Sequence, residues 1–147
     1  MEIMKITTRE SDLLAALLLV WEDSVRQSHH FLTAADIAGL RPLVLQGLSL
    51  ISELWALRTV DGTYVGFMGI DGQKLEMLFI KGEQRGCGLG SMLLTQAIEE
   101  LGVTEVDVNE QNPQARDFYY KHGFYQAGRS AVDGQGRPFP ILHLRLK

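Results

Sequence analysis

This sequence has only one cysteine and no excess of positive charge, and each of these features argues against a class of protein. A single cysteine among 147 residues cannot form an internal disulfide, so nothing indicates an oxidising compartment. A formal net charge of −4 lacks the basic excess of nucleic-acid-binding modules, and we expect no nucleic-acid partner. Compositional bias is also absent, since 46% hydrophobic and 22% charged residues are typical of a globular chain. The length predicts one domain, 1–147.

Long hydrophobic runs are missing as well. The most apolar segment extends from Leu13 to Trp21, far short of the roughly 20 residues that a membrane-spanning helix needs. Acidic Glu10 and Asp12 precede it and no A-x-A triplet follows, so it is unlike a signal peptide. We therefore expect a buried helix, no membrane partner and a cytoplasmic location.

The first fifty residues indicate one strand and two helices. Residues 2–8 alternate between apolar and polar, as a half-buried strand does. Ser11 is the expected N-cap of a helix that apolar residues at helical spacing continue to about residue 26. Thr33 is a candidate cap for a second helix, which Pro42 is expected to divide.

A period of two then predicts three strands, at 54–60, 64–70 and 74–80. Asp61-Gly62 suits a type I′ turn between the first two strands, and Asp71-Gly72 suits a second such turn. The segment is therefore expected to form an antiparallel meander.

The second half of the chain indicates two further helices and three further strands. The first of these helices, 91–101, ends at Gly102. The second begins with Asn112 as N-cap and Pro113 at the first helical position, and ends at Lys121 or His122 with Gly123 as C′ residue. The expected strands are 105–109, 124–130 and 140–146.

A glycine-rich loop, 84–90, joins strand and helix in the middle of the chain. Gly86, Gly88 and Gly90 have no Cβ atoms where the backbone must turn tightly and approach a ligand. Unpaired amides at the start of the following helix, together with the helix dipole, predict an anion site suited to phosphate. The alternative is a tight turn with its glycines in the left-handed region. Arg85 adds a positive charge at the rim.

Two common phosphate motifs do not match this loop. A P-loop needs a lysine after its last glycine, but Ser91 and Met92 follow Gly90. A dinucleotide fingerprint needs G-x-G-x-x-G and a second βαβ half, and neither is present.

Two segments together resemble a known family. The loop Arg85-Gly86-Cys87-Gly88-Leu89-Gly90 matches R-x-x-G-x-G. A second pattern, N-x-x-A-x-x-F-Y-x-x-x-G-F, is matched by Asn112, Ala115, Phe118, Tyr119, Gly123 and Phe124. In this order, after a meander and before a hairpin, they resemble the two signatures of the GNAT family (GCN5-related N-acetyltransferases). The resemblance is good over 54–147.

The resemblance implies an α/β fold of mixed α+β type. Its central sheet is mostly antiparallel, splays between the fourth and fifth strands, here 74–80 and 105–109, and is flanked by about four helices. It also implies acetyl-CoA as cosubstrate and no metal.

Roles in binding acetyl-CoA follow from the same resemblance. The pantetheine arm would lie along the backbone of Leu78, Phe79 and Ile80, with Asn112 and Tyr119 also in contact with the cosubstrate. The Leu78 amide would be the oxyanion donor, and Tyr119 would protonate the leaving thiolate. The pyrophosphate would be bound by Arg85, Gly86, Cys87, Gly88, Leu89, Gly90 and Ser91.

Several alternatives stay open at this point. The alternative for Asn112 is a role as N-cap only, and the alternative for Tyr119 is a role as a core residue. Cys87 is interpreted as a small packed residue rather than a nucleophile, because the family transfers the acetyl group directly. The general base could be Glu76, a histidine or water. An acceptor pocket could be lined by His29 and His30, with Trp21, Ser24 and Phe31 nearby, or these could be ordinary residues around a helix end.

The predicted function is an acetyl-CoA-dependent N-acetyltransferase that moves an acetyl group directly to a primary amine of a small molecule or peptide in a ternary complex. The alternative is an acyl-CoA-binding sensor or regulatory domain without turnover, against which Tyr119 argues because binding alone needs no acid. A Rossmann-type nucleotide binder is a third interpretation, and it predicts a response to NAD and none to CoA. The acceptor, the length of the acyl group and the choice between monomer and homodimer stay open.

Overall fold

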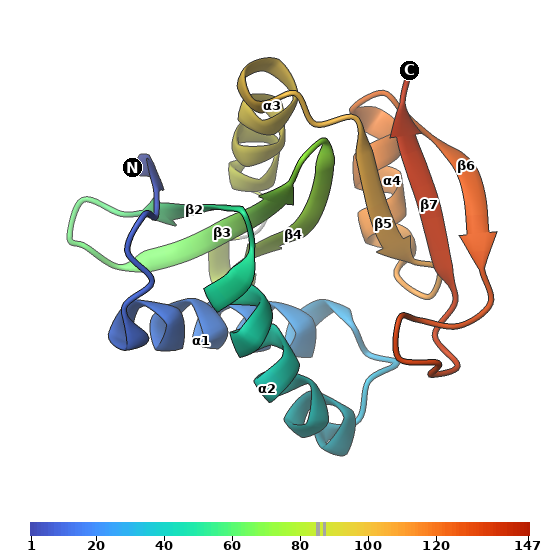
Figure 1. Ribbon diagram of the computed structural model, residues 1–147, viewed down its shortest axis with the longest axis horizontal. Helices are drawn as coiled ribbons and strands as arrows, with labels where there is room; N and C mark the ends of the chain where they lie inside the picture. Colours follow the sequence, from blue (N-terminus) through green and yellow to red (C-terminus); the bar gives the residue numbers. More distant parts are fainter. Residues whose placement is uncertain (85, 87) are drawn as a thin grey trace.

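The structure, a computed structural model, describes residues 1–84, 86 and 88–147 (Figure 1). Strands and helices alternate along much of the chain. In order they are β1 (Glu2–Lys5), α1 (Ser11–Ser28), α2 (Ala34–Leu50), β2 (Glu53–Arg58), β3 (Tyr64–Asp71), β4 (Lys74–Ile80), the short 3₁₀ helix η1 (Gly82–Gln84), α3 (Leu89–Leu101), β5 (Glu105–Asn109), α4 (Pro113–Lys121), β6 (Phe124–Ser130) and β7 (Ile141–Leu146).

One sheet contains all seven of these strands, in the order β1-β2-β3-β4-β5-β7-β6. Neighbouring strands are antiparallel except β4 and β5, which are parallel and pair only at Lys74↔Glu105 and Leu75↔Val106. Beyond Leu75 the two strands diverge, as Figure 1 shows. The predicted mixed sheet, splayed between its fourth and fifth strands and flanked by four α-helices, is confirmed.

Two apolar cores lie on opposite faces of the sheet. The α1/α2 core joins those helices to β2 and β3, and Leu17, Leu48 and Phe67 are fully buried there. The α3/α4 core joins the other two helices to both halves of the sheet and buries Leu93 and Leu144. Because the α3/α4 core contains residues of β2–β4 and also of β5 and β7, it connects the two half-sheets across the gap between β4 and β5.

Two expectations about α1 and α2 are corrected by the structure. Glu10, not Ser11, is the N-cap of α1, because Leu14 already donates to the Glu10 carbonyl and Ser11 is the first helical residue. Pro42 does not divide α2, which continues from Ala34 to Leu50. Proline removes one backbone hydrogen bond, but Ile37 and Leu48 bury on either side of it and hold both halves on the core. The predicted cap at Thr33 is confirmed as a capping box with Asp36.

Neither predicted type I′ turn is present, because that turn needs positive φ at both central residues and no non-glycine residue of the described chain has one. Between β2 and β3 the loop spans 59–63, and the Asp61 carboxylate accepts a hydrogen bond from the Thr63 amide. Between β3 and β4, Asp71 belongs to the strand and Gly72-Gln73 form the loop, with φ +61° at Gly72.

The ends of the later elements agree closely with the sequence. Strands β4, β5 and β6 have the predicted bounds, while β1 ends at Lys5 and β7 begins at Ile141. Asn112, Gly102 and Gly123 have their predicted capping positions. Helix α3 begins at Leu89, two residues earlier than expected. Over the described part of the chain, no helix is long and apolar enough to cross a membrane.

Candidate active site

A cavity of about 500 Å³ opens where β4 and β5 diverge. Its walls come from β4, β5, the start of α3, the inner face of α4 and the C-terminal end of α1. The cavity exists because two strands that pair at one end cannot fill the space between them at the other. Sequence-predicted residues that line it are Glu76, Leu78, Phe79, Ile80, Gly86, Gly88, Leu89, Gly90, Ser91, Asn112 and Tyr119.

The edge of β4 presents unpaired backbone groups to this cavity. The Lys81 amide donates to the Val65 carbonyl of β3 at 2.8 Å. Because the backbone groups of successive strand residues point alternately to either side, the N–H and C=O groups of Phe79, two residues earlier, also point toward β3. Leu78 and Ile80 therefore direct their N–H and C=O groups into the gap. Phe79 lines the cavity differently, with its ring 5.6 Å from that of Phe67 in the α1/α2 core.

A β-bulge lies in β4 beside the pairing with β5. Gly69 pairs with Met77 and Ile70 with Leu75, which leaves Glu76 without a partner on β3. One extra residue in a strand moves the side chains that precede it to the opposite face of the sheet from the one they would otherwise occupy. The bulge thus changes the side to which Glu76 points.

Ion pairs identify that side. The Glu76 carboxylate is 3.7 Å from Lys74 Nζ, which also lies 2.8 Å from Asp107 Oδ2. Asp107 points away from the α3/α4 core, because Val106 and Val108 on either side of it are buried there. Glu76 therefore shares the face of α1 and α2, opposite to the Leu78 side chain, whereas a regular strand would put both on one side.

The start of α3 fits an anionic group. Gly88 is the N-cap with φ +78°, and Gly86 has φ +80°. The first bond of the helix runs from the Met92 amide to the Gly88 carbonyl, so the amides of the three residues before Met92 have no partner inside the helix. These amides suit a pyrophosphate. Arg85 and Cys87 lie outside the described residues.

Helix α4 contributes Asn112 and Tyr119, which both line the cavity. Asn112 is only 6% exposed, and its Oδ1 accepts from the Ala115 amide at 3.3 Å. The sequence left open whether Asn112 caps the helix or contacts the cosubstrate; it caps the helix and also lines the cavity.

Tyr119 is buried, with its ring edge-on to Phe118 and Phe124 at 5.2 and 5.7 Å. Burial raises the pKa of the Tyr119 phenol above its ordinary value, because the phenolate would lose its hydration. At neutral pH the Tyr119 phenol therefore keeps its proton.

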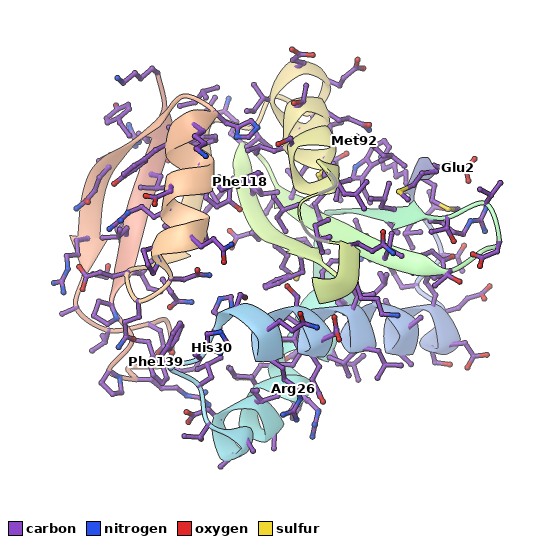
Figure 2. All side chains as sticks on the ribbon, turned by 180° about the vertical axis from the view of Figure 1, so that it is seen from behind. Glu2, Arg26, His30, Met92, Phe118 and Phe139 are labelled. Atoms are coloured by element: carbon purple, nitrogen blue, oxygen red, sulfur yellow. The ribbon has the colours of Figure 1, made fainter. Side chains whose placement is uncertain are left out.

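The end of α1 supplies the polar wall facing α4. Of the predicted acceptor-pocket residues, Ser24 and His29 line the cavity, while Trp21 is buried in the α1/α2 core. His30 and Phe31 are not among the described lining residues. The Phe31 ring instead packs at a tilt against that of Phe139, with 5.7 Å between the ring centroids. This contact joins the α1–α2 connection to the β6–β7 loop, the region in which Figure 2 labels Phe139 and His30.

Sequence reasoning missed Ser28, Gln84 and Gln114 in the lining. For Ser28 a signal was available, because it lies one helical turn after Ser24 and thus on the same face of α1. Gln84 and Gln114 carried no signal beyond their closeness to the two motifs. Among the described residues, no group of three or more His, Cys, Asp or Glu side chains could hold a metal ion.

Comparisons with known proteins agree with this geometry. Residues 50–139 match the family model described as the acetyltransferase (GNAT) domain. The chain is 41% identical over 128 residues to peptidyl-lysine N-acetyltransferase YjaB of Salmonella typhimurium strain LT2, covering 87% of this chain and 88% of that protein. YjaB of Escherichia coli K12 is also 41% identical over 128 residues, with 87% and 86% covered.

Solved structures show the same fold. The solution structure of the apo form of YjaB from Escherichia coli superposes with a TM-score of 0.86 at 37% identity, covering 99% of this chain and 97% of that one. The PaiA N-acetyltransferase of Thermoplasma acidophilum, solved in complex with coenzyme A, has a TM-score of 0.65 at 22% identity and 99% coverage of both chains.

Proposed function

The chain belongs to the GNAT family and is an acetyl-CoA-dependent N-acetyltransferase, and we propose that its acceptor is the side-chain amine of lysine in a peptide or protein. The observation that carries this proposal is the 41% identity to two proteins named peptidyl-lysine N-acetyltransferases. Asp107 of β5 lines both this cavity and a polar hollow formed with Lys74, Glu105 and His143, which places polar side chains beside the cavity.

Acetyl-CoA supplies the acetyl group as a thioester, and the residues around the splay would hold it. The amides at the start of α3 would bind the pyrophosphate, and the open edge of β4 would bind the arm as an added strand does. Asn112 would contact the same arm. The Leu78 amide would donate to the thioester oxygen as negative charge develops there, which is where a fixed donor lowers the barrier most.

Tyr119 would act as the general acid. The amine nitrogen forms a bond to the carbonyl carbon, the carbon–sulfur bond breaks, and the Tyr119 hydroxyl gives its proton to the departing thiolate. The acylated nitrogen releases its excess proton to water, and a proton from water restores the Tyr119 hydroxyl. The acceptor ammonium must first lose a proton. Glu76 is a candidate for receiving it through water, since it lines the cavity on the α1/α2 face.

Direct transfer, without an acetylated cysteine, is part of the proposal. Cys87→Ala is then expected to keep at least about a tenth of the activity, whereas removing a covalent nucleophile costs roughly 10⁴-fold or more in serine proteases. Mass spectrometry of the protein after exposure to acetyl-CoA alone provides the second measurement. An acetyl group trapped on Cys87 would overturn direct transfer.

The acceptor is tested with matched peptides. Thiol release from acetyl-CoA is measured with an α-N-blocked peptide that contains one lysine, and with the same peptide carrying norleucine in its place. Spermidine and free amino acids serve as small-molecule acceptors. Turnover of the lysine peptide alone, with acetyl-lysine found in the product, is the expected result. Preference for a free polyamine or an α-amine would contradict the proposed acceptor while leaving the acetyltransferase activity intact.

A further inference from the structure

Two side chains from distant parts of the chain meet at the cavity wall, and the mechanism above uses only one of them. His29 follows the C-terminal end of α1, and Asn112 begins α4. Asn112 Nδ2 lies 3.4 Å from His29 Nε2. The contact connects residues 83 positions apart and joins the helices on either side of the cavity.

The hydrogen bond from the Ala115 amide determines which end of the Asn112 carboxamide faces His29. Its Oδ1 accepts from the Ala115 amide, so the atom directed at His29 is the NH₂ nitrogen. Exchanging the two ends of the carboxamide would leave the Ala115 amide facing a donor. Asn112 is therefore the donor in its contact with His29.

The other side of the imidazole is assigned in the same way. The Ser28 hydroxyl donates to the Ser24 carbonyl at 2.9 Å, so Ser28 Oγ accepts from His29 Nδ1 at 2.8 Å. A neutral histidine with its proton on Nδ1 has a lone pair on Nε2. The donors thus run in one direction, from Asn112 through His29 and Ser28 to the backbone of α1.

Because Asn112 is buried, its contact with His29 fixes the orientation of the carboxamide. The carboxamide has two N–H groups, and at 6% exposure water satisfies neither freely. One N–H points at His29, which fixes the plane of the carboxamide between the imidazole and the helix cap. The second N–H is held in a defined direction within a side chain that lines the cavity.

We propose that His29 is a positioning residue: it holds the Asn112 carboxamide so that the free N–H donates to an amide carbonyl of the pantetheine arm. This rests on the contact between Asn112 and acetyl-CoA put forward above. His29 accepts a hydrogen bond from Asn112 and takes no proton from the acceptor amine. The end of α1 thereby contributes to binding the acyl donor, although it lies outside both motifs, 85–90 and 112–124.

Two substitutions of His29 separate positioning from proton transfer. Alanine removes the acceptor atom, whereas glutamine supplies an acceptor oxygen but cannot take up a proton at neutral pH. For His29→Ala we expect CoA binding, measured by calorimetry, to weaken about three- to tenfold, the range of one neutral hydrogen bond. The KM for acetyl-CoA rises equally, and kcat at saturating donor stays within about twofold. His29→Gln recovers most of the affinity.

The neighbouring residue provides a matched control. His30→Ala is expected to leave both constants unchanged, because His30 is not among the described residues that line the cavity. Ser28→Ala keeps the imidazole but removes its anchor, so it is expected to weaken CoA binding in the same direction and by less. If His29→Gln loses kcat as severely as His29→Ala while CoA binding is intact, His29 is a proton acceptor and the proposal is overturned.

A double-mutant cycle tests whether His29 acts through Asn112. Asn112→Ser keeps a side-chain oxygen suited to capping α4 but removes the NH₂ group and adds no charge beside His29, so it separates the donor function from helix stability. We expect Asn112→Ser to weaken CoA binding and His29→Ala to add nothing in that background. Full additivity overturns the positioning role and leaves the site intact. Unchanged CoA binding by Asn112→Ser would instead contradict the underlying contact with acetyl-CoA.

Discussion

Gly90 of α3 lies against the ring of Phe118 of α4: a Cβ atom on Gly90 would be 3.4 Å from Phe118 Cζ. Figure 2 shows Phe118 between the two helices, on the side of the cavity. Gly90 has no positive φ and belongs to the first turn of α3, so its role is close approach and not an unusual backbone conformation.

Gly90→Val is therefore expected to separate the two helices. The γ-methyl groups would extend beyond the Cβ position into the Phe118 ring, and overpacking of this kind costs about 1–3 kcal/mol. We expect a lower Tm and weaker CoA binding. Gly47→Val in α2 is the control, because nothing lies within 4 Å of a Cβ atom there. Equal effects of the two substitutions on CoA binding would contradict the role of this contact.

Gly88 tests the anion site. Asp and Asn both tolerate the positive φ at this position and both cap helices well, so they differ mainly in charge. Gly88→Asp is expected to weaken CoA binding at least about tenfold relative to Gly88→Asn, because a carboxylate would face the pyrophosphate. The shift of Tm with CoA concentration measures this by mass action. The same CoA affinity in both variants would contradict the proposal that the start of α3 binds the pyrophosphate.

Tyr119→Phe tests the general acid. The ring and its contacts remain, so CoA binding is expected to stay within a few-fold. General acids contribute about 10² to 10⁴ in rate, and a thiol with a pKa near 8.5 is a tolerable leaving group, so we expect kcat to fall by about 10². Tyr120→Phe is the control, since Tyr120 is exposed. A fall in kcat of less than about threefold, with CoA binding intact, would show that another group protonates the thiolate.

Asp107 predicts a pH-dependent contribution to stability. Burial raises the pKa of its carboxyl, but hydrogen bonds from Lys74 and His143 outweigh this and hold that pKa below the ordinary value. A lowered folded-state pKa stabilises the fold above the unfolded-state pKa of about 3.9, and this stabilisation disappears as pH falls through the folded-state pKa.

Asp107→Asn is accordingly expected to lower the free energy of unfolding by up to about 1 kcal/mol at neutral pH, the upper end for partly exposed ion pairs. Urea unfolding of both proteins between pH 7 and the acid limit of folding measures the difference. It is expected to shrink as the pH falls below about 5, because the Asp107 carboxyl then becomes protonated in both states. An undiminished difference at the acid limit of folding would contradict the assignment.

Features that depend on a few neighbouring residues were predictable from the sequence alone. The capping box at Thr33, the cap at Asn112 and the left-handed Gly102 and Gly123 at helix ends are of this kind. Each depends on hydrogen bonds or backbone freedom within about four residues, so the local pattern contains the whole cause. The two motifs are also local, so candidate cosubstrate residues could be proposed from the sequence alone.

Features that depend on strand register were not predictable. Asp61-Gly62 has the composition of a two-residue turn, but the pairing of β2 with β3 leaves a longer loop there. Glu76 lies only two residues from Leu78, yet one unpaired residue in β4 turns it to the opposite face. Pro42 has a strong local preference against helix, which the packing of α2 overrides.

The sequence by itself thus determined the order of elements, the caps of α2 and α4 and the chemistry that the second half of the chain carries. Only the tertiary structure decided which residues from the first half of the chain lie opposite the two motifs. The contact between His29 and Asn112 joins residues that no spacing rule relates, because it depends on where α1 ends relative to the gap between β4 and β5. That position is set by both cores packing on one twisted sheet, a property of the whole chain and not of any segment.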